Sequence, residues 1–189
     1  MNAAATGLPP GGGPAPVKAN WLHSAALLRD IIVALFLAII IIVFLYQPVR
    51  VEGTSMMPGL SDQERIFINK FTYKFNSIER GDTVVFWYPL DRTKVYIKRV
   101  IGLPGDVVRI DGGAVQVNGR LLQETYVPEE YRDGASLTPV RVEPNHYFVM
   151  GDHRSSSNDS RAWGTVDRRF IYGKAVFVYW PLSHMGTLH

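Results

Sequence analysis

Residues 95–106 read VYIKRVIGLPGD, a strand-like stretch that runs into a turn. The part from Val95 to Ile101 is rich in β-branched and aromatic residues at a two-residue period, which is typical of a β-strand. Pro104 and Gly105 then fit the two central positions of a type II turn, where proline fixes φ and glycine accepts a positive φ. The stretch predicts a strand followed by a tight turn, and it places Lys98 inside the strand.

Short stretches of the same kind recur on both sides, separated by Gly, Pro, Asp and Asn. The predicted strands are 65–69, 83–88, 95–101, 107–110, 114–117, 146–150 and 174–180. Asp111-Gly112-Gly113 and Asn118-Gly119 are hairpin signals. Residues 122–144 are polar and contain prolines, so we expect an irregular excursion there. We therefore expect a mainly β fold, with one antiparallel-sheet domain over residues 49–189.

A long apolar run precedes this domain. Residues 31–46 are uninterrupted apolar sequence, and Ala25 to Leu28 extend the run beyond Arg29-Asp30. At about 1.5 Å per residue the run spans a hydrocarbon core of about 30 Å. A cleavable signal peptide is disfavoured because residues 45–48 contain no small-x-small cleavage site. A buried core helix is disfavoured because no polar residue interrupts the long apolar run. We predict a single transmembrane anchor over residues 21–48, preceded by a disordered cytoplasmic tail over 1–20.

The composition excludes several classes of protein. The 189 residues hold one domain of ordinary size beside the anchor and tail. Lys and Arg number 20 against 17 Asp and Glu, and they form no basic run, so we expect no nucleic-acid partner. The chain has no cysteine, and its five histidines show no ligand spacing. We therefore expect neither a metal nor a cofactor.

Ser55 and Lys98 are the candidate reacting groups. A serine hydroxyl is a poor nucleophile until a base accepts its proton. Lys98 shares a strand face with Tyr96 and Val100, and burial among such groups lowers a lysine pKa until the neutral amine can act as a base. No Ser-x-x-Lys motif is present, and Met57 occupies the last position of a would-be Gly-x-Ser-x-Gly, so the penicillin-binding and α/β-hydrolase classes are excluded. Taken alone, Ser55 is better explained as a turn residue, since Gly53 and Pro58-Gly59 lie on either side of it.

Four ordered motifs carry a resemblance to a known family. They are Ser55-Met56-Met57-Pro58, RGDTVVF at 80–86, the stretch 96–106, and GDHRSSSNDSR at 151–161 followed by Trp163-Gly164. In this order and spacing the chain resembles a bacterial type I signal peptidase over nearly everything after residue 30.

The resemblance implies a role for each matching residue. Ser55 would be the nucleophile, its backbone N–H an oxyanion donor, Lys98 the general base, and Ser157 the residue that orients the lysine amine. The small apolar substrate pockets would be formed by Met56, Leu60, Tyr96 and Ile97. A structural charge set would comprise Arg99, Asp152, Asp159 and Arg161. The family also implies a cytoplasmic N-terminus and an extracytoplasmic catalytic domain in the plasma membrane, an orientation that the flanking charges alone leave open.

Two positions depart from the pattern. Many relatives have a serine two residues before the nucleophile, where this chain has Gly53, so the second oxyanion donor is open. Position 153 is commonly asparagine and is histidine here. His153 therefore raises a rival Ser-His-Asp triad that uses Asp152 or Asp159.

The leading hypothesis is a membrane-bound serine endopeptidase. It would remove signal peptides from exported preproteins with a Ser-Lys dyad and cleave after small-x-small sites, with membrane lipids around its anchor. A Ser-Lys autoprotease of the phage-repressor type shares the chemistry but has no membrane span and needs a DNA-binding segment. A membrane-anchored β-sheet binding module without catalysis is the third hypothesis, and loss of processing in a Ser55 variant would exclude it.

Overall fold

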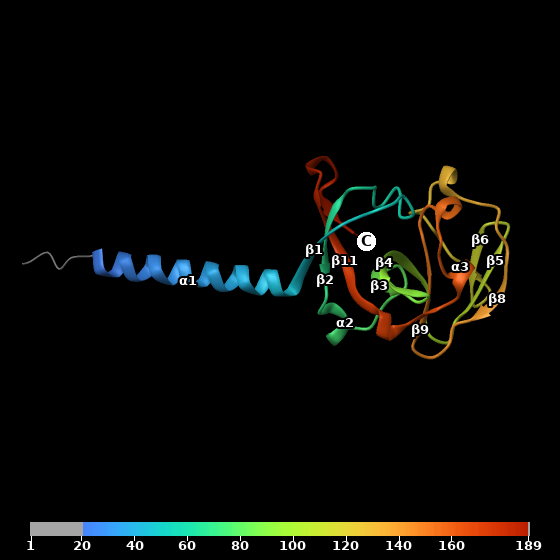
Figure 1. Cartoon of the computed structure of the whole chain (residues 1–189), viewed down its shortest axis with the longest axis horizontal. Helices are drawn as coiled ribbons and strands as arrows, with labels where there is room; N and C mark the ends of the chain where they lie inside the picture. The colour runs from blue at the N-terminus through green and yellow to red at the C-terminus, as the bar shows by residue number, and fades with distance from the viewer. Residues whose placement is uncertain (1–20, 189) are drawn as a thin grey trace, which may run out of the picture. The chain divides into compact units, whose positions relative to one another are not determined.

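The computed structural model describes residues 21–188, so the predicted tail over 1–20 lies outside the described residues. The described residues up to Ile41 belong to one compact unit, and those from Ile42 to 188 belong to another. The first belongs to a single helix, α1 (Trp21–Leu45), in which Ala25–Leu45 is long and apolar enough to cross a membrane (Figure 1). Its two charged side chains pair, with Arg29 Nη2 lying 2.8 Å from Asp30 Oδ1.

Helix α1 ends before the predicted limit of the anchor at residue 48. Residues Tyr46–Arg50 form strand β1, which pairs antiparallel with β2 (Arg65–Asn69). Pro48 explains the difference, because proline cannot continue a helix interior and is tolerated in an edge strand. Strand β1 is such an edge strand at one end of its sheet.

Two antiparallel sheets make up the second unit, which confirms the mainly β fold with an N-terminal helix (Figure 1). The larger sheet has the order β1-β2-β11-β3-β4-β9-β10, with β12 paired to β11. Its further strands are β3 (Thr83–Tyr88), β4 (Asp91–Gly102), β9 (His146–Met150), β10 (Val166–Asp167), β11 (Ile171–Trp180) and β12 (Gly186–Thr187). The smaller sheet has the order β7-β6-β5-β8. Its strands are β5 (Val107–Asp111), β6 (Ala114–Val117), β7 (Arg120–Leu121) and β8 (Leu137–Arg141).

The predicted turns are present. Asp106 N–H donates to Leu103 O at 3.0 Å, and Gly105 has φ of 91°, as a type II turn requires. Gly112-Gly113 closes the β5–β6 hairpin, and Asn118-Gly119 closes the β6–β7 hairpin with φ of 54° and 75°. These turns fix the register of the smaller sheet.

The predicted excursion over 122–144 is only partly irregular. It contains the 3-10 helix η1 (Glu129–Tyr131) and ends in strand β8, which pairs with β5. Short helices elsewhere in the described chain are α2 (Thr72–Phe75), η2 (Arg154–Ser156), α3 (Ser160–Trp163), η3 (Arg168–Phe170) and η4 (Leu182–His184).

The core is built on the two faces of the larger sheet. Val84 and Phe86 of β3 belong to one buried apolar cluster, and Val85 between them belongs to another, as alternation requires. A third cluster packs the β4 end and β9 against β5 and β6. These clusters hold β3 and β4 rigidly in the middle of the domain.

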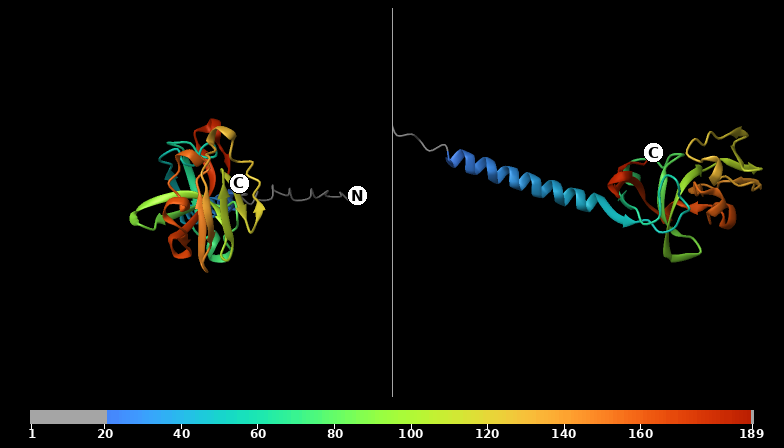
Figure 2. Two further views of the ribbon diagram at one scale, coloured as in Figure 1. Left: turned by 90° about the vertical axis from the view of Figure 1, so that its right-hand side faces the viewer. Right: turned by 90° about the horizontal axis from the view of Figure 1, so that it is seen from above.

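Strand β4 is paired differently along its length. From Thr83↔Arg99 to Tyr88↔Asp91 it is bonded to β3, whereas its pairing with β9 begins only at Arg99↔Met150. The residues before Arg99 therefore have an open edge among the described strands. Figure 2 shows the β3–β4 hairpin, in light green, projecting from the body of the domain.

Candidate active site

Ser55 lies in a turn that directly follows β1. The β1–β2 ladder is prolonged by the Val51 N–H, which donates to Glu64 O at 2.8 Å. Gly53 then turns the chain with φ of 93°, and its N–H donates to Asp62 Oδ1 at 2.8 Å. This hydrogen bond occupies the Gly53 N–H, so a second oxyanion donor has to come from another group.

Lys98 reaches Ser55 from the centre of β4. Its Nζ lies 2.6 Å from Ser55 Oγ and donates to Ile97 O at 3.1 Å. The lysine is only 4% exposed, and its strand neighbours Tyr96 and Val100 contribute to one apolar cluster. Burial lowers the pKa of Lys98 to about 8, against the opposing effect of the Asp159 and Asp152 carboxylates. A substantial fraction of the amine is therefore neutral near pH 8, and neutral amine can accept a proton.

A groove of about 620 Å³ opens onto these two side chains. Its walls are the segment 49–53, which leads to Ser55, and residues 93–97 on the open edge of β4. Met56, Tyr96 and Ile97 line it, as does Asn158, which the sequence did not single out. Leu60 is not among the lining residues, because it is buried at 2% exposure in the core cluster that also contains Met56. Leu60 therefore packs beside Met56 in the core next to the groove, and its contact with a substrate stays a prediction.

Ser157 does not make the hydrogen bond expected of it. Its Oγ is buried and makes no hydrogen bond to the Lys98 amine. The lysine amine is hydrogen-bonded to Ser55 Oγ and Ile97 O instead. Ser157 instead packs tightly beside Gly151, where a methyl group would overlap both its hydroxyl and the Ser55 carbonyl oxygen. A glycine is thus required at position 151, because the chain there passes very close to both Ser157 and Ser55.

His153 does not form a catalytic triad in this structure. Its Nδ1 lies 3.2 Å from Thr54 O, and its ring packs edge-on against Tyr131. No hydrogen bond among the described residues joins its ring to Ser55 or to either aspartate. His153 contacts Ser55 through its backbone instead, because the His153 N–H donates to Ser55 O at 3.1 Å.

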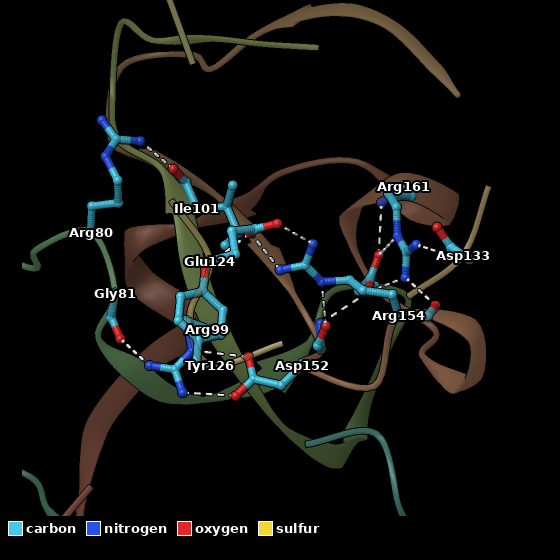
Figure 3. Close-up of polar contacts among 12 residues, drawn as sticks. Arg80, Gly81, Arg99, Ile101, Glu124, Tyr126, Asp133, Asp152, Arg154 and Arg161 are labelled. Atoms are coloured by element: carbon cyan, nitrogen blue, oxygen red, sulfur yellow. Dashed lines mark hydrogen bonds and ion pairs between the residues drawn. The ribbon is translucent and has the colours of Figure 1, made fainter. Parts of the chain in front are cut away.

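The four charged residues implied by the resemblance form two ion pairs, one of Arg99 with Asp152 and one of Arg161 with Asp159. Figure 3 shows the first of these pairs. Arg99 binds Asp152 with both Nε and Nη2, at 2.9 and 2.7 Å. Arg161 binds Asp159. Burial raises the pKa of Asp159, but the hydrogen bonds and charge of Arg161 outweigh this effect and hold the pKa below its usual range. None of the four side chains bonds the Ser55 hydroxyl or the Lys98 amine.

Sequence reasoning missed a third buried ion pair. Glu124 and Arg154 are joined by two hydrogen bonds of 2.6 and 2.8 Å, with side-chain exposures of 2% and 3%. In the sequence, Glu124 is a glutamate in a polar segment without a strand pattern, and no local motif indicates that it pairs with Arg154. No group of three or more His, Cys, Asp or Glu side chains within residues 21–188 is arranged to hold a metal ion.

Known proteins resemble this chain along most of its length. The sequence model of the family described as signal peptidase, peptidase S26, matches residues 24–180. A probable signal peptidase I-2 of Synechocystis sp. is 38% identical over 181 residues, covering 92% of this chain and 79% of the relative. A signal peptidase I of Bacillus licheniformis is 40% identical over 167 residues, covering 83% of this chain and 89% of the relative. A crystal structure of a signal peptidase I from Enterococcus faecalis V583 has 30% identity and a TM-score of 0.46, covering 52% of this chain and 97% of that one.

These matches define a serine endopeptidase. The chain belongs to the signal peptidase family, peptidase S26, whose members remove signal peptides.

Proposed function

We propose that this endopeptidase works by a Ser-Lys dyad in which Ser55 is the nucleophile and Lys98 the general base. The observation that carries the proposal is the 2.6 Å separation of Lys98 Nζ and Ser55 Oγ at a buried amine with a lowered pKa. In the neutral state the amine accepts the Ser55 proton as Oγ attacks the substrate carbonyl carbon. The ammonium formed then protonates the leaving amine, and the Ser55 backbone N–H stabilises the oxyanion. Water, with Lys98 again as base, hydrolyses the acyl-enzyme.

The substrate binds in the groove as an added strand. Before Arg99, β4 has no second strand partner among the described strands, and its residues 93–97 form one wall of the groove, which suits an extended peptide. Bulky side chains line the groove near Ser55, namely Met56, Tyr96 and Ile97. They leave shallow space, so the residue before the cut and the second residue upstream of it must be small, as in Ala-x-Ala. The substrates are signal peptides of exported preproteins, and no nucleic acid takes part.

The apolar helix α1 anchors the enzyme in the plasma membrane, with lipids around its exposed apolar side chains. The N-terminus lies in the cytoplasm and the catalytic domain on the outer side, where exported chains emerge. Anchoring enzyme and substrate in one bilayer raises their effective concentration.

Single substitutions of the two reacting residues test the dyad. Ser55→Ala and Lys98→Ala should each abolish cleavage of a signal-peptide substrate, and the double variant should be no worse, because the two groups act as one unit. Thermal melting checks the fold of each variant. Near-normal turnover in Lys98→Ala together with loss in His153→Ala would replace the dyad by the triad.

A further inference from the structure

We propose that Glu124 and Tyr126, which follow β7, are positioning residues that hold Ser55 and Lys98 in reacting geometry. This inference rests on the dyad proposed above and extends the active site into a segment that looked irregular in the sequence. Both residues act through arginines, and neither touches the reacting atoms. Figure 3 shows the two side chains between Arg99 and Arg154.

Glu124 is connected to Ser55 through Arg154. The carboxylate accepts from both terminal nitrogens of the guanidinium, and the remaining Nε–H donates to Gly151 O at 2.9 Å. Gly151 begins the short loop whose His153 N–H donates to the carbonyl oxygen of Ser55. The guanidinium is planar and its donors are fixed in direction, so the position of Glu124 sets the position of this loop.

Tyr126 is connected to Lys98 through Arg99. The Arg99 guanidinium lies 4.2 Å from the centre of the Tyr126 ring, and the same arginine binds Asp152 in the loop just described. The Tyr126 hydroxyl donates to Glu124 Oε1 at 3.0 Å, which joins the two connections. Arg99 is the residue next to Lys98 in β4, so one segment fixes both the strand of the base and the loop beside the nucleophile.

The energetics of buried ion pairs favour a positioning role over a purely stabilising one. Desolvation offsets most of the attraction in such a pair, and well-packed apolar residues often stabilise a core equally well. A buried ion pair does, however, fix the direction and the distance between the two segments that carry its side chains. A shift of about 1 Å between reacting groups lowers rates by roughly a hundredfold, so geometry at this point has a large kinetic effect.

The decisive variant is the double substitution Glu124→Gln with Arg154→Met in the full chain in detergent. It leaves no unpaired buried charge, so the domain should fold, but it removes the link to Gly151. We expect kcat to fall at least about tenfold while KM for a signal-peptide substrate stays within about twofold, because neither residue lines the groove. Tyr126→Phe keeps the ring over Arg99 and loses only the hydroxyl, so we expect a smaller fall in kcat, roughly threefold.

Glu129→Gln is the matched control, since this glutamate lies in the same segment and pairs with Arg132 at the surface, 91% exposed. It should leave kcat, KM and the melting temperature unchanged. If the double variant melts lower but keeps its kcat well below the melting temperature, the pair only stabilises the fold and the inference is wrong. That result is separable from failure of the dyad, which would show as activity in Lys98→Ala whatever the Glu124 series does.

Discussion

In the proposed mechanism, the protonation of Lys98 sets the pH at which the site can react. A free lysine has a pKa of about 10.4 and is almost wholly charged near neutrality. Burial lowers the pKa of Lys98 to about 8, so the neutral base appears as the pH rises through that value. We predict that kcat/KM increases with pH along an acidic limb with its midpoint near 8. The measurement is cleavage of a signal-peptide substrate across the pH range, and a limb that climbs to about pH 10 would contradict the proposed base.

The same lysine should lower the stability of the fold at neutral pH. Its pKa is lower in the folded than in the unfolded chain, so between about 8 and 10.5 the unfolded chain binds more protons and stability rises with pH. Below that window both states are charged and the folded state carries the full desolvation penalty, up to about 3 kcal/mol.

We therefore predict that Lys98→Met, which should abolish activity, raises the free energy of unfolding by about 2 kcal/mol at pH 7. The gain should shrink as the pH rises from about 8 through 10.5, and it should reach its lower limit only above that value, where the lysine is neutral in both the folded and the unfolded chain. Denaturant melts at several pH values measure both effects. Lys94→Met, at an exposed position of the same strand, serves as control and should change little. A gain that stays constant with pH would show that desolvation of Lys98 is not its source.

Among the elements, β4 depends on one glycine where it meets the smaller sheet. A methyl group at Gly102 would lie 2.7 Å from Val108 Cγ2 and 3.0 Å from Phe148 Cβ. We predict that Gly102→Ala destabilises the domain by about 1–3 kcal/mol through overpacking. Gly134→Ala, where a methyl group meets nothing within 4 Å, should be close to neutral. Equal melting temperatures for the two variants would refute the overpacking argument.

The elements also show what a sequence can and cannot predict. The sequence predicts strands β2, β3, β6 and β9 with their observed limits, because burial on a sheet face imposes a visible period. Strand β1 was hidden by the apolar run before it, and β8 by Pro139 and polar neighbours. Ser55 and Lys98 were identified from motifs, whereas the Glu124–Arg154 pair joins positions 30 apart and leaves no local pattern. A two-residue period of apolar side chains is enough to predict a strand. A contact between residues far apart in the sequence can be identified only in the folded structure.

For the whole molecule, the absence of cysteine from the sequence allows a clean test of orientation. A single cysteine placed at Leu90, which is 72% exposed at the β3–β4 hairpin, should react with a membrane-impermeant maleimide in intact cells. A cysteine at Lys18, before the span, should react only after the membrane is opened. The reverse labelling pattern would place the catalytic domain in the cytoplasm and contradict the proposed function.

The open edge of β4 has a second consequence, for self-association. An unpaired strand edge is a template for any extended chain, including the same edge of another copy, and such contacts lead to aggregates. The hairpin end of this edge carries Asp91, Arg92 and Lys94, and the Lys94 amine lies 3.1 Å from the Asp91 carboxylate. Charges at this position oppose the approach of a second edge while leaving the stretch nearer Lys98 open to a peptide. The strand proposed to receive the substrate is thus also one that needs protection from its own copies.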